Sequence, residues 1–289
     1  MKKLRQLLLI TLSLGLMLLL GGCSHMALLN PKGVVAAAES KYLIMSTCLM
    51  LIIVIPVIIL VFIVAWRYRR KNTKAKYSPN WAHNNLLEAV WWTVHCIIIV
   101  VLAIITWIST HELNPYKPIH IQGKKPLTIQ VIALNWKWLF IYPKQGVATI
   151  NAMPIPVNTP IKLYITSDAP MNSLEIPQLA GQIYAMGGMR TTLYLVANHV
   201  GNYAGLSTNY SGNGFAGMKF RVNATSEAKF KQWVETAKKA SKAKLDQATY
   251  HQLVKPSKNN KVEYFSPVQA GLFEHEIKKF MKPYMRKPA

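Results

Sequence analysis

Two long uncharged apolar segments constrain most strongly how this chain can fold. Residues 43–66 form a run of 24 residues without Asp, Glu, Lys or Arg, and residues 89–110 form a second run of 22. A helix of roughly 20 apolar residues is long enough to cross the hydrocarbon core of a bilayer. We therefore predict a hairpin of two transmembrane helices over residues 43–110, joined by a loop at residues 67–87.

The connecting loop sets the expected orientation of this hairpin. It is rich in basic residues and has no acidic residue. Its basic residues are Arg67, Arg69, Arg70, Lys71, Lys74 and Lys76. Short basic loops stay in the cytoplasm. We therefore expect the N-terminal segment 23–42 and the chain after about residue 110 to lie on the outer side.

The outer part of the chain is itself strongly basic. Residues 110–289 contain 23 Lys and Arg against 9 Asp and Glu. Long exported domains escape the rule that governs short loops, so this excess does not reverse the orientation. Charge alone would allow a nucleic-acid partner, but an exported, membrane-tethered domain rarely meets one, and we expect none. Two explanations of the basic excess stay open. An acidic exterior would protonate carboxylates, so that a chain adapted to it carries few of them, or the Lys-rich helices bind anionic membrane lipids.

The first segment has the pattern of a bacterial lipoprotein signal. Lys2, Lys3 and Arg5 precede a Leu-rich run that ends in Gly-Gly-Cys at Cys23. Small residues before a cysteine at the end of such a run predict removal of the signal peptide 1–22 and acylation of Cys23. The result would be an inner-membrane protein with two spans and a lipid anchor. An uncleaved third helix with an incidental cysteine is the alternative.

The outer domain reads as an all-β structure without cysteine. The remaining cysteines, Cys48 and Cys96, lie in the apolar runs, so residues 111–224 can form neither a disulfide nor a thiolate metal site. Short segments rich in Val, Ile, Thr and Tyr alternate with Pro, Gly and Asn, which predicts an antiparallel β-sandwich or barrel. These segments are LTIQVIAL, WKWLFIY, ATINAM, IKLYIT, NSLEI, TTLYLVA, GNYAGLS and GMKFRV.

The last part of the chain, residues 225–289, reads as a helical, aromatic-rich tail. Ser226 can cap the segment EAKFKQWVETAKKA, whose apolar residues recur at helical spacing. We expect two further short helices, around residues 246–254 and 270–281.

Several long stretches carry a resemblance to a known family. They are LNWKWLFIYPKQG, the region from MNSLEIPQLAGQIYAMGGM to GNGFAGMKF, and VEYFSPV, and they follow the two predicted spans. Together they resemble subunit II of haem-copper terminal oxidases, and within that family the bacterial quinol oxidases of the cytochrome bo type. The resemblance implies a cupredoxin-like sandwich and a place in a proton-pumping ubiquinol oxidase. Subunit I and other oxidase subunits would be its partners, with the haems, the copper and the quinol reaction in subunit I.

The same resemblance points to a lost copper centre. In the cytochrome c oxidase members of the family, two cysteines, two histidines, a glutamate carbonyl and a methionine hold two copper ions. The corresponding positions here are Asn172, Ser207, Asn209, Ser211, Phe215 and Met218. Only the methionine keeps a copper-binding side chain, and a neutral serine hydroxyl cannot replace a bridging thiolate. We therefore predict no metal, no redox cofactor and no catalysis in this chain by itself.

Charge and other candidate ligands agree with that prediction. No acidic residue occurs from Ile176 to Ser226, so a basic cytochrome c would find no complementary surface, and we expect no cytochrome c partner. The thioethers of Met186, Met189 and Met218 could in principle hold Cu(I), but methionines in a sandwich more often fill core gaps.

Four further residues have both a functional and a structural interpretation. Trp136 and Trp138 match an aromatic stretch between copper and haem in copper-bearing relatives, and we expect them to serve packing here. Glu88 resembles a glutamate at the mouth of the K proton pathway, but it could equally be a carboxylate that suits a helix N-terminus. His95 would be either an intramembrane functional group or a neutral histidine hydrogen-bonded to subunit I.

Two functions remain in competition at this point. The first is a structural and assembly subunit of a quinol oxidase. The second is a free-standing membrane lipoprotein that binds copper or aids oxidase assembly. The two long spans and the C-terminal VEYFSPV favour the first.

Overall fold

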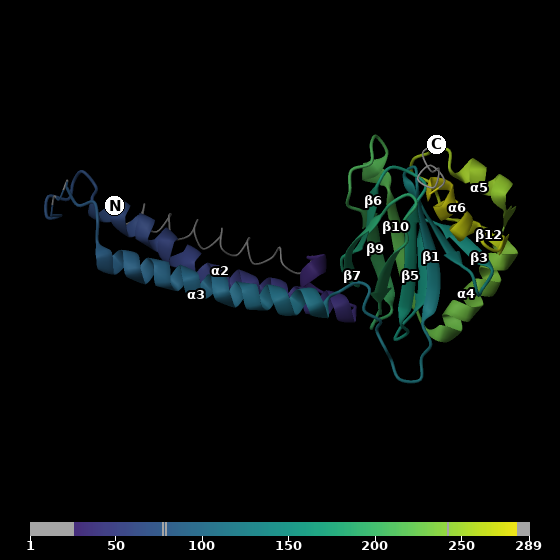
Figure 1. Ribbon diagram of the computed structural model, residues 1–289, viewed down its shortest axis with the longest axis horizontal. Helices are drawn as coiled ribbons and strands as arrows, with labels where there is room; N and C mark the ends of the chain where they lie inside the picture. Colours follow the sequence, from purple (N-terminus) through teal and green to yellow (C-terminus); the bar gives the residue numbers. More distant parts are fainter. Residues whose placement is uncertain (1–25, 77, 79, 242, 282–289) are drawn as a thin grey trace, which may run out of the picture. The chain divides into compact units, whose positions relative to one another are not determined.

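The computed structural model describes residues 26–76, 78, 80–241 and 243–281, which form two compact units (Figure 1). One unit is helical and comprises residues 39–114. The other contains the described residues up to 38 together with those from 115 onward. The predicted signal peptide and Cys23 lie outside the described residues.

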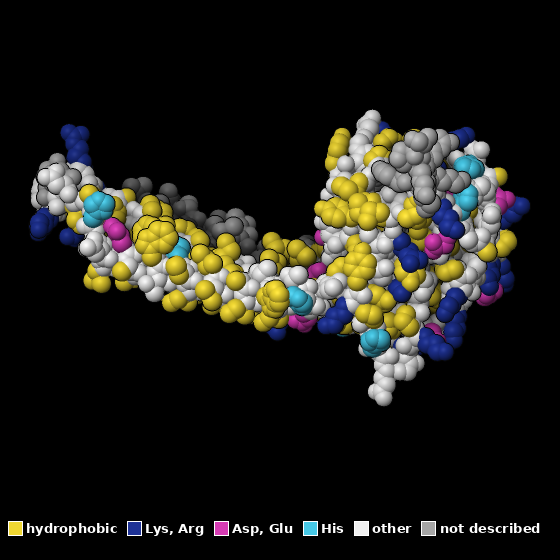
Figure 2. All heavy atoms as spheres, in the orientation of Figure 1, with side chains coloured by type: hydrophobic (Ala, Val, Ile, Leu, Met, Phe, Trp, Pro, Cys, Tyr) yellow, Lys and Arg dark blue, Asp and Glu magenta, His cyan; other side chains and the backbone are white. Residues whose placement is uncertain are grey.

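The helical unit consists of two helices that are long and apolar enough to cross a membrane. They are α2 (Val34–Arg67), of which residues 39–67 belong to this unit, and α3 (Asn85–Glu112). Within this unit the Tyr42 hydroxyl donates a hydrogen bond to Glu112 and so ties the start of α2 to the end of α3. Hydrophobic side chains are exposed along these helices (Figure 2), which is the pattern of a surface that faces lipid or other protein.

The other unit is a sandwich of two β-sheets (Figure 1). The first sheet has the order β11-β12-β3-β2-β1-β5-β8, and the second has the order β4-β10-β9-β6-β7. The strands of the first sheet are β1 (Leu127–Leu134), β2 (Lys137–Tyr142), β3 (Val147–Ile150), β5 (Ile161–Ser167), β8 (Thr191–Leu195), β11 (Ala243–Leu245) and β12 (Glu263–Val268). Those of the second are β4 (Ala152–Pro156), β6 (Asn172–Ile176), β7 (Ala180–Ala185), β9 (Gly201–Ser207) and β10 (Lys219–Thr225).

The expected sandwich is confirmed, but its strands are not all antiparallel. β1 runs parallel to β5, and β4 runs parallel to β10. In both cases the intervening chain crosses to the other sheet before it returns, and such crossovers bring strands together in the same direction.

The core is organised around β2, which is buried on both faces. Side chains of a strand alternate between its two faces. Trp138, Phe140 and Tyr142 therefore enter the core between the sheets, while Leu139 and Ile141 enter a second apolar cluster on the outer side of the first sheet.

The C-terminal segment supplies the cover for that second cluster. Three helices were expected here and are confirmed as α4 (Glu227–Ala240), α5 (Gln247–Leu253) and α6 (Leu272–Met281). The segment also contributes β11 and β12, so the expectation of a purely helical tail was incomplete. β12 pairs antiparallel with β3, and Phe265 lies opposite Ala148. Tyr250 and Phe273 complete the cluster against the outer face of β2.

Candidate functional site

The predicted ligand positions of the lost copper centre gather at the ends of two paired strands. Asn172 begins β6 and Ser207 ends β9, and the two strands are antiparallel neighbours. The other four positions lie beyond β9: three in the loop 208–217, which includes the short 3-10 turn η3 (Phe215–Gly217), and Met218 directly before β10. The fold thus brings together Asn172, Ser207 and the loop that follows β9.

Asn172 and Ser207 bind each other directly. The Ser207 hydroxyl donates to Asn172 Oδ1 at 3.0 Å, and Asn172 Nδ2 donates to the Pro170 carbonyl at 2.6 Å. Both side chains are buried. Buried polar groups are stable when paired in this way, and neither side chain offers the thiolate or imidazole that copper requires.

The remaining positions act as loop and core residues. Asn209 Nδ2 donates to the Met171 carbonyl at 2.8 Å, which ties the loop to the segment before β6. Phe215 packs edge-on against Tyr210, with ring centroids 5.6 Å apart. Met218 is 1% exposed and belongs to the core between the sheets. The donor set therefore does not fit a bound copper pair.

Trp136 secures this loop. Its indole Nε1 donates to the Ser211 carbonyl at 3.1 Å. Its ring lies directly over Gly214, where an added Cβ would come within 2.3 Å of the ring. The Trp136 backbone has a φ of 63°, a left-handed conformation that is uncommon for a tryptophan and turns β1 into β2. Trp138, by contrast, is fully buried in the core.

Other metal candidates gain no support from the described part of the chain. Among the described residues there is no group of three or more His, Cys, Asp or Glu that could hold an ion. Met189 is 52% exposed, whereas Met218 is buried in the core, so these two thioethers do not share an environment.

In the helical unit, Glu88 and His95 lie near the N-terminal end of α3. Asn84 caps the helix by accepting a hydrogen bond from the Leu87 amide at 3.0 Å, and Glu88 lies in the first turn. Glu88 Oε1 is 3.4 Å from His83 Nδ1. A carboxylate at this place interacts favourably with the helix dipole.

His95 finds a hydrogen-bond partner within its own helix. Its Nδ1 is 2.8 Å from the Trp91 carbonyl. A carbonyl can only accept, so Nδ1 carries a proton, and Nε2 is an acceptor when the ring is neutral. His111 repeats the arrangement with the Trp107 carbonyl at 2.8 Å.

A buried ionic cluster in the sandwich unit was not predicted from the sequence. Asp168, directly after β5, accepts hydrogen bonds from Lys279 Nζ at 2.8 and 2.9 Å and from the Tyr250 hydroxyl at 3.1 Å. Glu276 is 1% exposed, and its carboxylate lies 3.6 Å from Lys279 Nζ. The cluster fastens α5 and α6 to the end of the first sheet, and we call it the Asp168 cluster.

Burial and charge shape the titration of the Asp168 cluster. Burial, and secondly the negative charge of Asp168, raise the pKa of the Tyr250 hydroxyl above its usual range. For Lys279, burial alone would lower the pKa, but the contacts with Asp168 and Glu276 outweigh it and raise the pKa. Tyr250 is therefore a neutral donor and Lys279 a charged one at neutral pH.

Comparisons with known proteins agree with the resemblance found in the sequence. Residues 239–284 match the family described as "COX Aromatic Rich Motif". The chain is 53% identical over 269 residues to the cytochrome bo(3) ubiquinol oxidase subunit 2 of Pseudomonas aeruginosa, covering 93% of this chain and 80% of that protein. It is 49% identical over 264 residues to the ubiquinol oxidase subunit 2 of Acetobacter aceti, covering 91% and 85%. A crystal structure of the periplasmic domain of cytochrome oxidase subunit II from Bradyrhizobium japonicum matches at 26% identity with a TM-score of 0.38, covering 39% of this chain and 94% of that one.

Proposed function

The chain belongs to the family of ubiquinol oxidase subunit 2, and from this premise we propose that it is a structural subunit of a quinol-fed terminal oxidase with no redox centre of its own. The observation that carries the proposal is the Ser207–Asn172 hydrogen bond at the ligand positions. A site that lacks thiolate and imidazole donors, whose Ser207 and Asn172 side chains bind each other and whose Met218 is buried in the core, does not suit a copper pair. Electrons would then reach the oxidase from a membrane quinol through subunit I.

The helices support a docked role for this subunit. Their large apolar side chains are widely exposed in the chain by itself, with Phe62 and Trp107 each 70% exposed. Such surfaces face lipid or a partner in the assembled protein. We propose that α2 and α3 pack against subunit I in the inner membrane and that the sandwich lies on the outer side. Acylation of Cys23 belongs to the same proposal. A free-standing lipoprotein, the alternative, is not favoured by the close relatives.

The first prediction concerns metal content and electron donor. In the purified complex, we expect copper and haem only in the amounts that subunit I accounts for, and no near-infrared band of a mixed-valence copper pair. Oxygen uptake should proceed with ubiquinol and be at background level with reduced cytochrome c. The reason is that Ser207 and Ser211 cannot bind the copper pair that would accept electrons from cytochrome c. An oxidase whose subunit II bears copper is the matched control.

Two results would contradict this proposal. One is copper that stays with this subunit after it is separated from subunit I. The other is oxygen uptake with cytochrome c at a rate comparable to that with quinol.

The second prediction concerns Glu88. If the Glu88 carboxylate passes protons, Glu88→Gln should lower the rate of quinol-driven oxygen reduction by about tenfold or more, because a positioned proton-transfer group contributes at least that much to the rate. The pH dependence of the rate should also shift. Glu88→Asp should keep most of the activity. The measurement is oxygen uptake from pH 5 to 9 at matched haem content. If Glu88→Gln reduces only the amount of assembled complex, the carboxylate serves the helix N-terminus alone.

A further inference from the structure

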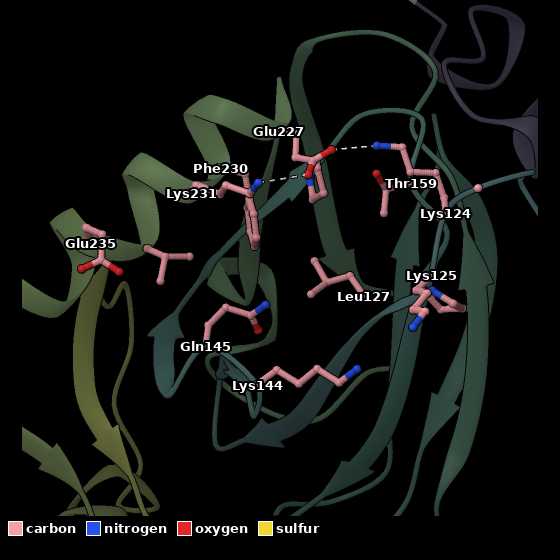
Figure 3. Close-up of a pocket in the computed structure, with 14 residues that line it drawn as sticks. Lys124, Lys125, Leu127, Lys144, Gln145, Thr159, Glu227, Phe230, Lys231 and Glu235 are labelled. Carbon is pink, nitrogen blue, oxygen red and sulfur yellow. Dashed lines mark hydrogen bonds and ion pairs between the residues drawn. The ribbon is translucent and has the colours of Figure 1, made fainter.

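A cavity of about 690 Å³ opens within the sandwich unit beside α4 (Figure 3). It is bordered by the starts of α4 and β1, the end of β4 and the turn between β2 and β3. Its volume falls in the range of roughly 300–1,000 Å³ that is typical of small-molecule sites. None of the residues discussed above as oxidase features lines it.

One face of α4 forms a wall of this cavity. The lining residues of the helix recur at spacings of three and four, so they share one side of it. They are Glu227, Phe230, Lys231, Val234 and Glu235. Phe230 and Val234, together with Leu127 at the start of β1, give the cavity an apolar lining. A ligand that fills it must therefore carry an apolar part.

The rim of the cavity carries an excess of positive charge. Four lysines and two glutamates line it. Glu227 is paired with Lys124 at 2.7 Å and with Lys231 at 3.3 Å, and Glu235 is paired with Lys238, outside the cavity, at 3.0 Å.

The other two rim lysines have no such partner. Among the described residues, Lys125 and Lys144 take part in no ion pair. In Figure 3 the side chain of Lys144 extends away from α4 toward the side of the cavity where Lys125 lies. These two ammonium groups are free to bind an anion.

Gln145 adds an unpaired acceptor. Its Oε1 is buried and has no hydrogen-bond partner among the described residues. Figure 3 shows its amide directed into the space between Leu127 and Lys144. A buried acceptor without a partner is costly, so it favours a ligand that brings a hydroxyl donor next to the anionic group.

The cavity lies at the end of the sandwich where the chain passes to the two helices. Leu127 is opposite Ile161, and Ile161 is opposite Leu195, so these three residues mark one end of the sheet. At this end the Tyr194 amide donates to the Pro115 carbonyl at 3.2 Å, and Gly33 pairs with Ala197.

We propose that this cavity binds an anionic membrane phospholipid, with the phosphate at Lys125 and Lys144, a headgroup hydroxyl at Gln145 and acyl methylenes against Phe230, Val234 and Leu127. Charge, apolar lining and the unpaired acceptor each point to this ligand class, and the two candidate membrane spans bring the chain to a bilayer that supplies it. The site assigns phosphate binding to two of the many lysines of the basic outer domain. It is independent of whether the subunit carries a redox centre.

The test is photolabelling of the intact oxidase complex. The complex is reconstituted with a trace of photoreactive phosphatidylglycerol or, separately, photoreactive phosphatidylcholine, and the label is mapped by mass spectrometry to the peptides of α4. We expect labelling by the anionic lipid. In the double variant Lys125→Gln/Lys144→Gln it should fall about 10- to 30-fold, since each lysine near an anionic surface contributes roughly tenfold or less. The control Lys229→Gln/Lys239→Gln changes two exposed lysines of α4 outside the cavity and should stay near the wild-type level.

Each other outcome overturns the proposal. Equal labelling by both lipids would show that charge is not recognised, and displacement by millimolar inorganic phosphate would show a free-anion site. Unchanged labelling in the double variant would exclude the two lysines as ligands of the lipid phosphate. Lys144→Glu reverses one charge on an exposed turn and separates loss of binding from loss of folding. This variant should abolish the label while the haem content and the thermal stability of the complex stay unchanged.

Discussion

Replacement of Asp168 with alanine is expected to lower the free energy of unfolding of the sandwich unit by about 2–4 kcal/mol. The Asp168 side chain is only 5% exposed and binds both Lys279 and Tyr250. Its loss leaves the buried Tyr250 hydroxyl without an acceptor and removes the ion pair that fastens α6 beside the end of β5. The full penalty of a broken buried pair is discounted because the Lys279 side chain is 42% exposed and can regain water.

Thermal denaturation and limited proteolysis of the assembled complex measure this effect. A loss of that size corresponds to a fall in melting temperature of roughly 5–15 °C for a unit of this length. Cleavage in the segment before α6 should become faster. Glu235→Ala, which removes an exposed pair with Lys238, is the control and should shift the melting temperature by no more than about 3 °C. Equal shifts for the two variants would show that the Asp168 cluster does not fasten α6.

The same cluster predicts sensitivity to alkali. The pKa values of both Tyr250 and Lys279 are raised in the folded chain. A raised pKa contributes stability that is present below the unfolded value, which is 10.0 for the tyrosine, and that is lost as the pH rises beyond it. The wild-type melting temperature should therefore fall more steeply above pH 10 than that of Tyr250→Phe.

Gly214→Ala is expected to destabilise the loop after β9 by roughly 1–3 kcal/mol. The new methyl group would come within 2.3 Å of the Trp136 ring, which is held by its hydrogen bond to Ser211. Either the ring or the loop must move. Gly217→Ala is the matched control in the same loop, because there the methyl group meets only the end of the exposed Asn259 side chain. Thermal melting and protease cleavage within residues 208–217 report the difference.

A double-mutant comparison isolates the cause. If the contact with the indole ring is responsible, Gly214→Ala should have little effect in a chain that already carries Trp136→Ala. A penalty of the same size in both backgrounds would place the strain elsewhere, for example in the loop backbone.

Local sequence patterns were sufficient to predict many of the strands and helices. Segments such as LTIQVIAL and IKLYIT combine β-branched residues with turn residues at each end, and both are confirmed as strands β1 and β5. The cap at Ser226 and the three C-terminal helices are confirmed for a similar reason, because capping and helical periodicity are local signals.

The errors arise where pairing depends on distant residues. ATINAM was expected as one strand, but Asn151 adopts a left-handed conformation with a φ of 57° and sends β3 and β4 to different sheets. β7 lies in AGQIYA, which has two small residues at its start and was not recognised. β12 contains Pro267 and pairs with β3, more than a hundred residues earlier in the chain.

The candidate site was predictable in position but not in detail. The spacing of Ser207, Ser211, Phe215 and Met218 located the loop, since the family motif is contiguous. The contacts that stabilise this loop could not be read from it, because Trp136 is 75 residues away from Ser211. The Asp168 cluster is equally non-local, with Lys279 lying 111 residues after Asp168.

The place of β12 in the first sheet has a consequence for biosynthesis. Until residues 263–268 have left the translocation machinery, β3 presents its unpaired backbone edge, which is a template for association with other nascent chains. The first sheet therefore stays open at this edge after the core between the sheets has formed. A chain without residues 263–268 would expose a backbone edge that quality-control proteases could recognise.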